Sequence, residues 1–283
     1  MSRGLQPFAL VDGGLQLEGV DLAEVAESLE GRPAWVIAGD AVLAALARAQ
    51  GRRRAIAIEV AAIGPPAVLA LLAPTGSWAS VASGHELALA RRAGFPGRRI
   101  VVDAPVLDDG LILEALTARV GVLVRRGPRE SAAVRRVAAL MRLPLPAARG
   151  APPCVPAATF ARCGGLLARL LAGPPAVVLD ALWEPAAPGR TRRAAAARPP
   201  VRVLAVQGRL GPPGRVTSLS GLTTVRASRA RLLGAPARGD WVIVADPASL
   251  AVRPPHPAWP QPRELLVHHG RWRRLEARPM PGE

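Results

Sequence analysis

Apolar and polar residues alternate near the start of the chain, a period typical of strands with one buried face. The segment 8–19 alternates on both sides of an Asp-Gly-Gly turn at residues 12–14, and this pattern predicts a β-hairpin. Asp21 then predicts the cap of a short helix over 22–29, with a glutamate three residues later. Short alternating runs return from residue 201 onward and predict an all-β module, which the N-terminal hairpin joins.

Between these two regions the pattern changes to short, continuous apolar runs separated by helical stretches. The predicted strands are 34–38, 55–60, 78–82, 99–103 and 120–124, and the predicted helices are 40–50 (capped by Asp40), 66–72, 85–93, 108–118 and 129–141. Continuous apolar strands spaced by helices argue for a parallel sheet, hence an α/β fold. The repetition of short strand–helix units favours a (β/α) barrel over an open sheet.

The barrel is expected to be shortened. Residues 143–156 predict a loop, 157–171 a helix and 176–180 a strand, and a stretch rich in Pro, Arg and Ala follows at 190–200. A complete barrel of eight units takes about 250 residues, which is more than this part of the chain provides. We therefore expect an N-terminal segment at 1–30, a truncated barrel-like domain at 31–200 and a β-domain at 201–283.

The composition changes the interpretation of the charge. The chain contains no Lys, Asn or Tyr, residues with AT-rich codons, which indicates a GC-rich bacterial genome and explains why every basic side chain except histidine is arginine. Residues 1–120 carry 11 Arg and 13 Asp or Glu, a net charge of −2, whereas 121–283 carry 26 Arg and 8 Asp or Glu, a net charge of +18. Codon usage does not explain this division, so the basic half is a candidate docking surface.

The sequence shows neither a signal peptide nor an apolar run long enough to span a bilayer. Cys154 and Cys163 lie in a stretch rich in Pro, Gly and Ala, and we interpret them as reduced thiols. These features predict a cytoplasmic protein with no membrane partner.

Several blocks of sequence resemble one enzyme family. They are GRPAWVIAGD at 31–40, ASVASGHELALARRAGFPGRRIVVD at 79–103, PGR at 188–190 with RVLAVQ at 202–207, and TSLSGLTTV at 217–225. In order and spacing they resemble the diaminopimelate, ornithine and arginine decarboxylases, which are fold-type III pyridoxal-phosphate enzymes. The resemblance implies an alanine-racemase-like (β/α) barrel with a C-terminal β-domain, a dimer, and lyase chemistry in amino-acid metabolism.

The departures from this family concern its chemistry. In IEVAAI at 58–63, Ala61 stands where the family has the lysine that forms the Schiff base. Ser220 stands at the family's cysteine position and Thr224 at its acid position. Gly189 and Arg190 remain as candidates for an anion contact. We therefore predict no catalytic residue and no cofactor, with pyridoxal phosphate bound only non-covalently if at all.

The histidines suggest no catalytic or metal centre. His85 follows a predicted strand and starts a helix, and we interpret it as a surface residue that caps this helix. His256, His268 and His269 form no recognised metal-ligand spacing with the two cysteines, so no metal site is predicted.

Three functional hypotheses follow. The first is a pseudoenzyme with the shape of a decarboxylase, which acts as a regulatory or scaffold subunit in amino-acid-derived or specialised metabolism. Its expected partner is a protein, either an active paralogue or an acidic carrier protein, in a homodimer or a heterodimer. The second is a divergent enzyme that works without a Schiff-base lysine. The third is a basic module that binds nucleic acid or an acidic partner; nucleic acid is disfavoured because no recognition helix is evident.

Overall fold

The computed structural model describes most of the first 160 residues and a set of strands beyond them. The described residues are 7–51, 55–63, 65–146, 150–160, 163–169, 183–185, 202–205, 210–216, 230–233, 241–245 and 263–275. The chain forms two compact units: residues 1–44 with 160–283, here called the β-rich unit, and residues 45–159, called the parallel-sheet unit. The domain boundaries expected at residues 30 and 200 stay predictions, and the strand expected at 176–180 lies outside the described residues.

The β-rich unit starts with a small antiparallel sheet and a short helix. The elements are β1 (Phe8–Val11), β2 (Gly14–Leu17), β3 (Val20–Asp21) and α1 (Leu22–Glu27). Phe8 pairs with Leu17, which confirms the expected hairpin. Asp21 accepts a hydrogen bond of 2.8 Å from the backbone N–H of Ala23, which confirms its predicted role as a helix cap.

The main sheet of this unit has the strand order β12-β15-β10-β4-β16-β17. Its strands are β4 (Ala34–Ala38), β10 (Gly164–Arg169), β12 (Arg202–Ala205), β15 (Trp241–Ala245), β16 (Arg263–His268) and β17 (Arg271–Arg274). A smaller sheet holds β11 (Trp183–Pro185), β13 (Leu210–Val216) and β14 (Ala230–Leu233). β4 pairs in parallel with β16 and antiparallel with β10. This corrects one expectation: residues 34–38 form a strand, but in this mixed sheet instead of the parallel one.

The prediction of a helix over 157–171 was wrong. A 3-10 turn at Ala157–Phe160 precedes strand β10, which pairs with β4 on one side and β15 on the other. Composition rich in Ala and Leu favours a helix, but tertiary pairing overrides such preferences. Gly164 makes this pairing possible, because a Cβ at its position would lie only 2.1 Å from the carbonyl oxygen of Val36.

A single apolar core joins the N-terminal segment to the main sheet. Leu15 and Leu17 of the hairpin and Leu22 of α1 are fully buried together with apolar residues of the sheet, among them Val36 of β4 and Val267 of β16. Burial of such side chains stabilises the fold by about 1.5–3 kcal/mol each. The expectation that the hairpin joins the β-domain is thereby confirmed.

The parallel-sheet unit alternates strands and helices. Its strands are β5 (Ala57–Glu59), β6 (Trp78–Val81), β7 (Ile100–Val102), β8 (Val122–Leu123) and β9 (Cys154–Val155). Its helices are α3 (Val60–Ile63), α4 (Pro66–Leu72), α5 (Gly84–Arg92), α6 (Asp109–Thr117) and α7 (Pro128–Met141). Helix α2 (Gly39–Gln50) follows β4, and the boundary between the two units falls within it.

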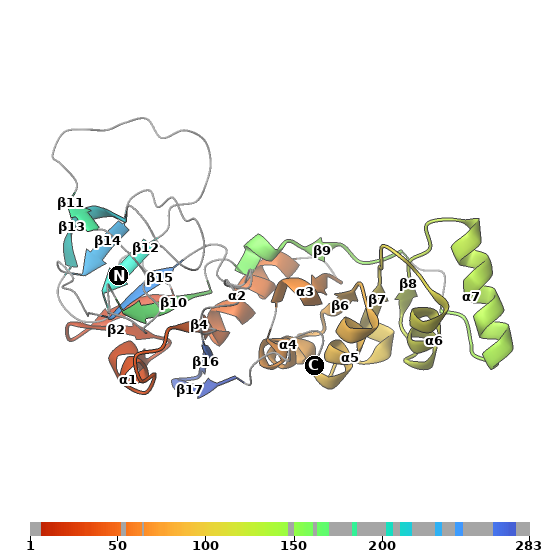
Figure 1. Ribbon diagram of the computed structural model, residues 1–283, viewed down its shortest axis with the longest axis horizontal. Helices are drawn as coiled ribbons and strands as arrows, with labels where there is room; N and C mark the ends of the chain where they lie inside the picture. Colours follow the sequence, from red (N-terminus) through yellow and green to blue (C-terminus); the bar gives the residue numbers. More distant parts are fainter. Residues whose placement is uncertain are drawn as a thin grey trace, which may run out of the picture. The chain divides into compact units, whose positions relative to one another are not determined.

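The parallel sheet is an arc of a barrel. Its strand order is β8-β7-β6-β5-β9, so each strand from β5 to β8 pairs in parallel with the next. Helices α4 to α7 follow one another along the arc, each in contact with the next (Figure 1). Sequential parallel pairing of this kind is typical of a (β/α) barrel. Within the described residues β8 and β9 do not pair, so the barrel is incomplete.

In the described part of the chain, no helix combines the length and apolar character that a membrane crossing requires.

Replacement of Gly164 tests the close pairing of β10 with β4. We expect Gly164→Ala to lower the free energy of unfolding by about 2–3 kcal/mol, because the new methyl group must push the two strands apart. Urea denaturation followed by circular dichroism measures the change. Gly150→Ala is the matched control, since a Cβ at Gly150 meets no atom within 4 Å. Equal stability of the two variants would contradict the close pairing.

Candidate functional site

Ala61 lies at the carboxyl edge of the parallel sheet, where the resemblance places the family's chemistry. Strand β5 ends at Glu59 and α3 begins at Val60, so Ala61 is an exposed residue in the first turn of α3. The strand predicted over 55–60 is therefore shorter than expected. Pyridoxal phosphate needs a primary amine for its covalent attachment, and a methyl group supplies none. Ala61 and the absence of lysine from the chain do not fit this attachment.

Cys154 lies on β9, which pairs in parallel with β5. Cys154 is an exposed residue, but partial burial of its thiol raises the pKa. Hydrogen bonding to the Ser80 side chain offsets part of this rise, and the nearby Glu59 carboxylate raises the pKa further. The thiolate is the nucleophilic form of cysteine. Since a raised pKa keeps the thiol protonated at neutral pH, Cys154 is a weak nucleophile.

Arg126 and two carboxylates at this edge are engaged with one another. Arg126, just before α7, forms an ion pair with Asp103, which follows β7, and also donates a hydrogen bond to the carbonyl oxygen of Ala104. The backbone N–H of Arg126 donates to the carboxylate of Glu130 in the first turn of α7. The Arg126 side chain thus links the ends of two strands, which is a structural role.

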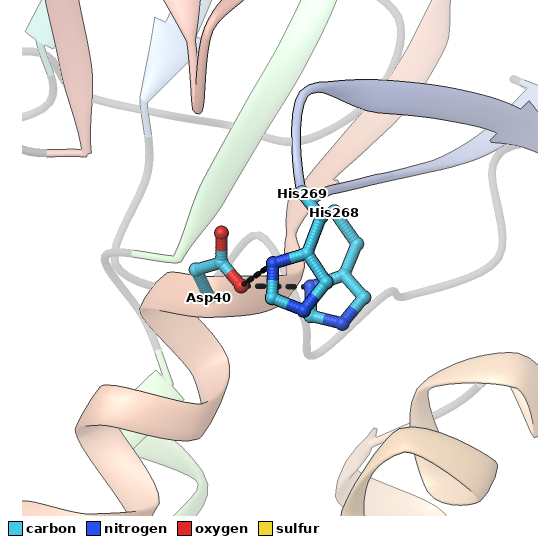
Figure 2. Close-up of side chains that lie close together, drawn as sticks. All are labelled: Asp40, His268 and His269. Atoms are coloured by element: carbon cyan, nitrogen blue, oxygen red, sulfur yellow. Dashed lines mark ion pairs between the residues drawn. The ribbon is translucent and has the colours of Figure 1, made fainter.

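A second polar cluster lies in the β-rich unit, at the carboxyl ends of the parallel pair β4 and β16. Asp40 follows β4 and lies in the first turn of α2, and His268 ends β16. His269 is the first residue of the turn from β16 to β17. Figure 2 shows the two imidazole rings facing the carboxylate of Asp40. Because the carboxyl ends of parallel strands meet at one edge of a sheet, residues far apart in the sequence come together here.

The distances within this cluster are short. Nδ1 of His268 lies 2.8 Å from Oδ1 of Asp40, and Nδ1 of His269 lies 3.5 Å from the same oxygen. The two rings are stacked, with centroids 3.8 Å apart and planes inclined at 28°. Nδ1 of His268 is buried, and its contact with Asp40 lacks the geometry of a hydrogen bond. The three side chains therefore present a carboxylate oxygen and two imidazole nitrogens to one another.

Two tight turns hold these side chains in place. His269 and Gly270 both have positive φ, +50° and +69°, and so do Glu18 and Gly19 in the turn from β2 to β3, at +48° and +82°. Consecutive residues of positive φ are typical of two-residue hairpin turns. A Cβ on Gly19 would lie 3.9 Å from the Cα of Gly270, so the two turns lie against each other.

Glu18 caps helix α2 from this neighbouring turn. Its Oε1 accepts a hydrogen bond of 2.8 Å from the backbone N–H of Ala41. Burial raises the pKa of Glu18, and its hydrogen bonds to the backbone of Ala41 and Asp40 oppose this rise. The prediction that Asp40 caps the helix is corrected, because α2 begins at Gly39 and Glu18 binds its free N–H groups. The carboxylate of Asp40 is directed at the histidines instead.

Gly39 lets His268 approach the start of α2. A Cβ at Gly39 would lie 3.0 Å from Cβ and from Nδ1 of His268 and 3.0 Å from the carbonyl oxygen of Val267. A side chain at this position would displace the imidazole, so the lack of a side chain at Gly39 helps to form the cluster.

The structure places the residues predicted from the sequence as follows. Five of them lie outside the described residues: Gly189, Arg190, Ser220, Thr224 and His256. His85 is exposed on α5, as predicted, but it does not cap this helix.

The cap of α5 comes from its neighbours in the sequence. Ser83 accepts a hydrogen bond from the N–H of Glu86, whose carboxylate accepts one from the N–H of Ala82.

Asp40 and Glu18 are the residues that sequence reasoning missed as companions of His268 and His269. Asp40 follows two residues after the strand 34–38, and the strand 263–268 ends in His268, and these polar residues beyond apolar runs were the available signal. It was insufficient because the two strands are widely separated in the sequence, so their parallel pairing cannot be read from either segment.

The chain is similar to several solved structures, among them diaminopimelate decarboxylases. One is diaminopimelate decarboxylase from M. jannaschii in complex with L-lysine, with a TM-score of 0.65 and 13% identity over 96% of this chain and 95% of that chain. Another is AQ1208 from Aquifex aeolicus, with a TM-score of 0.61 and 13% identity over 94% of each chain. A third is diaminopimelate decarboxylase from Helicobacter pylori in complex with L-lysine, with a TM-score of 0.59 and 11% identity over 89% of this chain and 95% of that chain.

No protein-family model matches the chain, and no curated protein matches it by sequence. The structural likeness nevertheless establishes the fold, which is that of the diaminopimelate decarboxylases. The expected fold class is therefore confirmed: an incomplete alanine-racemase-like (β/α) barrel with a β-domain that the N-terminal hairpin joins.

The reactivity of Cys154 tests the electrostatics of the parallel sheet's edge. We expect its alkylation by iodoacetamide to have a pH midpoint above the ordinary thiol value of 9.0, because burial disfavours the thiolate. Mass spectrometry of a Cys163→Ser variant over a pH series measures this midpoint. Ser80→Ala should move the midpoint higher still, since it removes the hydrogen bond that favours the thiolate. A midpoint below 9.0 would contradict this description.

Proposed function

We propose that this chain is a catalytically inactive pseudoenzyme of the decarboxylase fold, which acts by binding another protein. The observation that carries the proposal is the absence of any lysine from the chain, and the sequence resemblance puts Ala61 where the family has its Schiff-base lysine. Arginine cannot take over this role, because its guanidinium group stays protonated and is not a nucleophile. Among the described residues at the edge of the parallel sheet, the thiol of Cys154 has a raised pKa and Arg126 is paired with Asp103, so neither is a ready substitute.

A role in binding is supported by the distribution of charge. The net charge of +18 over residues 121–283 includes the arginines of β17, which is the edge strand of the main sheet. Arg271 and Arg273 are exposed on this strand. Arginines on an edge strand discourage aggregation, and they also attract acidic partners. We infer that the partner is an acidic protein, such as a carrier protein or a paralogue, rather than nucleic acid.

Reduction with borohydride tests the absence of a covalent cofactor. We expect the purified chain, incubated with pyridoxal phosphate and then reduced, to carry no pyridoxyl adduct beyond its α-amine, because no other primary amine exists. Intact mass followed by peptide mapping locates any adduct. An adduct within residues 45–159 would contradict the proposal.

Ala61→Lys is the informative companion variant. It returns a primary amine to the family's position, while Ser220 and Thr224 still stand where the family has its cysteine and its acid. We expect no release of carbon dioxide from diaminopimelate by this variant. Release at a measurable rate would show that the remaining site is intact and that the chain is a divergent enzyme.

Charge reversal on β17 tests the docking surface. We expect the double variant Arg271→Glu with Arg273→Glu to capture less of the proteins that the wild-type chain captures from a bacterial lysate at about 0.05 M salt. At 1 M salt the two chains should capture similar amounts, because charges are then screened within about 3 Å. Quantitative mass spectrometry of the captured proteins measures the effect. Arg48→Glu with Arg92→Glu, two exposed arginines of residues 1–120, is the matched control. Unchanged capture by the β17 variant at low salt would exclude this surface.

A further inference from the structure

We propose that Asp40, His268 and His269 bind a divalent transition-metal ion, for which Zn²⁺ is the best match. Their ligand atoms all lie within 4.8 Å of one another at the carboxyl ends of β4 and β16 (Figure 2). Neither the proposed pseudoenzyme function nor the fold of the decarboxylases requires such a site. The proposal concerns a separate feature of the β-rich unit.

The chemistry of the donors selects the class of ion. Two imidazole nitrogens and one carboxylate oxygen are ligands typical of Zn²⁺ and of other first-row transition metals. Ca²⁺ and Mg²⁺ prefer shells made of oxygen atoms alone, so two histidines disfavour them. Three protein ligands leave at least one coordination position for water or for a further ligand.

The distances are close to those of an assembled site. Ligands that lie about 2.0–2.2 Å from Zn²⁺ in a tetrahedron are about 3.3–3.5 Å from one another. Oδ1 of Asp40 lies 2.8 Å from Nδ1 of His268 and 3.5 Å from Nδ1 of His269. Small side-chain movements therefore suffice to admit an ion. An ion would also supply a partner for the buried Nδ1 of His268, which makes no hydrogen bond.

The left-handed turn explains how two consecutive histidines face one ligand. Successive side chains of a strand point to opposite faces, so a regular strand would separate the two rings. His269, with φ of +50°, leaves the strand conformation and stacks its ring on that of His268. Nearly parallel rings direct their nitrogens side by side, so a shared ion requires the His269 ring to turn. Its side chain is 78% exposed and has room to do so.

The surrounding charges favour a cation. The N-terminus of α2 carries a partial positive charge, which by itself opposes a metal ion. Glu18 accepts hydrogen bonds from this helix end and brings a second carboxylate close to Asp40. Since Glu18 fulfils the capping role, the carboxylate of Asp40 is available to the ion. Bound there, the ion links the start of α2 to the turn between β16 and β17.

Titration of the untagged chain with Zn²⁺ tests this site. Isothermal titration calorimetry should give one Zn²⁺ per chain, and Co²⁺ should develop visible d–d absorption on binding. His269→Gln, at an exposed position, and His268→Gln should each weaken binding at least about tenfold, because each removes a direct ligand. Binding should also weaken on acidification, since protons compete with the ion for imidazole nitrogen.

Two further variants separate the site from general effects. His85→Gln removes an exposed histidine of the parallel-sheet unit and should bind Zn²⁺ as the wild type does. Gly39→Ala keeps every ligand but displaces His268, and it should weaken binding as well. At one fixed Zn²⁺ concentration the melting temperature of the wild type should rise more than that of His269→Gln. Absence of binding by the wild type, or binding by His269→Gln as tight as that of the wild type, overturns the proposal.

Discussion

The parallel pairing of β4 with β16 is the constraint on which the β-rich unit depends. It aligns Ala34 with Arg263 and Ala38 with Val267, and so joins a strand from the start of the chain to one near its end. The apolar side chains of both strands are buried in the core that also holds the N-terminal hairpin. Without this pairing the hairpin and α1 would lose the surface against which they pack.

The same pairing has a chemical consequence at the edge of the sheet. It places the start of α2 beside the turn that follows β16, so that a carboxylate and two imidazoles meet there. Two supporting features concern close approach: Gly39 makes room for the side chain of His268, and the turn at Glu18 lies against the turn at Gly270. The cluster therefore depends on the backbones of several segments as well as on its own three side chains.

The parallel-sheet unit keeps the packing that its fold requires. Its strands pair in sequence and its helices pack in sequence, because apolar residues at the required spacing are retained. At the carboxyl edge the described residues place Ala61 in the first turn of α3, a thiol of raised pKa at Cys154 and an arginine engaged with an aspartate. Packing and chemistry place separate demands on a sequence, and the described residues of this unit meet the packing demands.

The sequence by itself determined the elements whose signals are local. Asp21 caps α1 through a hydrogen bond to the N–H of Ala23 two positions away, so its effect was readable in a short window. Periodicity likewise located most strands to within a residue or two. Tertiary structure decided that 164–169 is a strand, that β4 belongs to the mixed sheet and that Asp40 faces two histidines. These outcomes depend on contacts between segments far apart in the chain, and no local pattern of residues encodes which segments will pair.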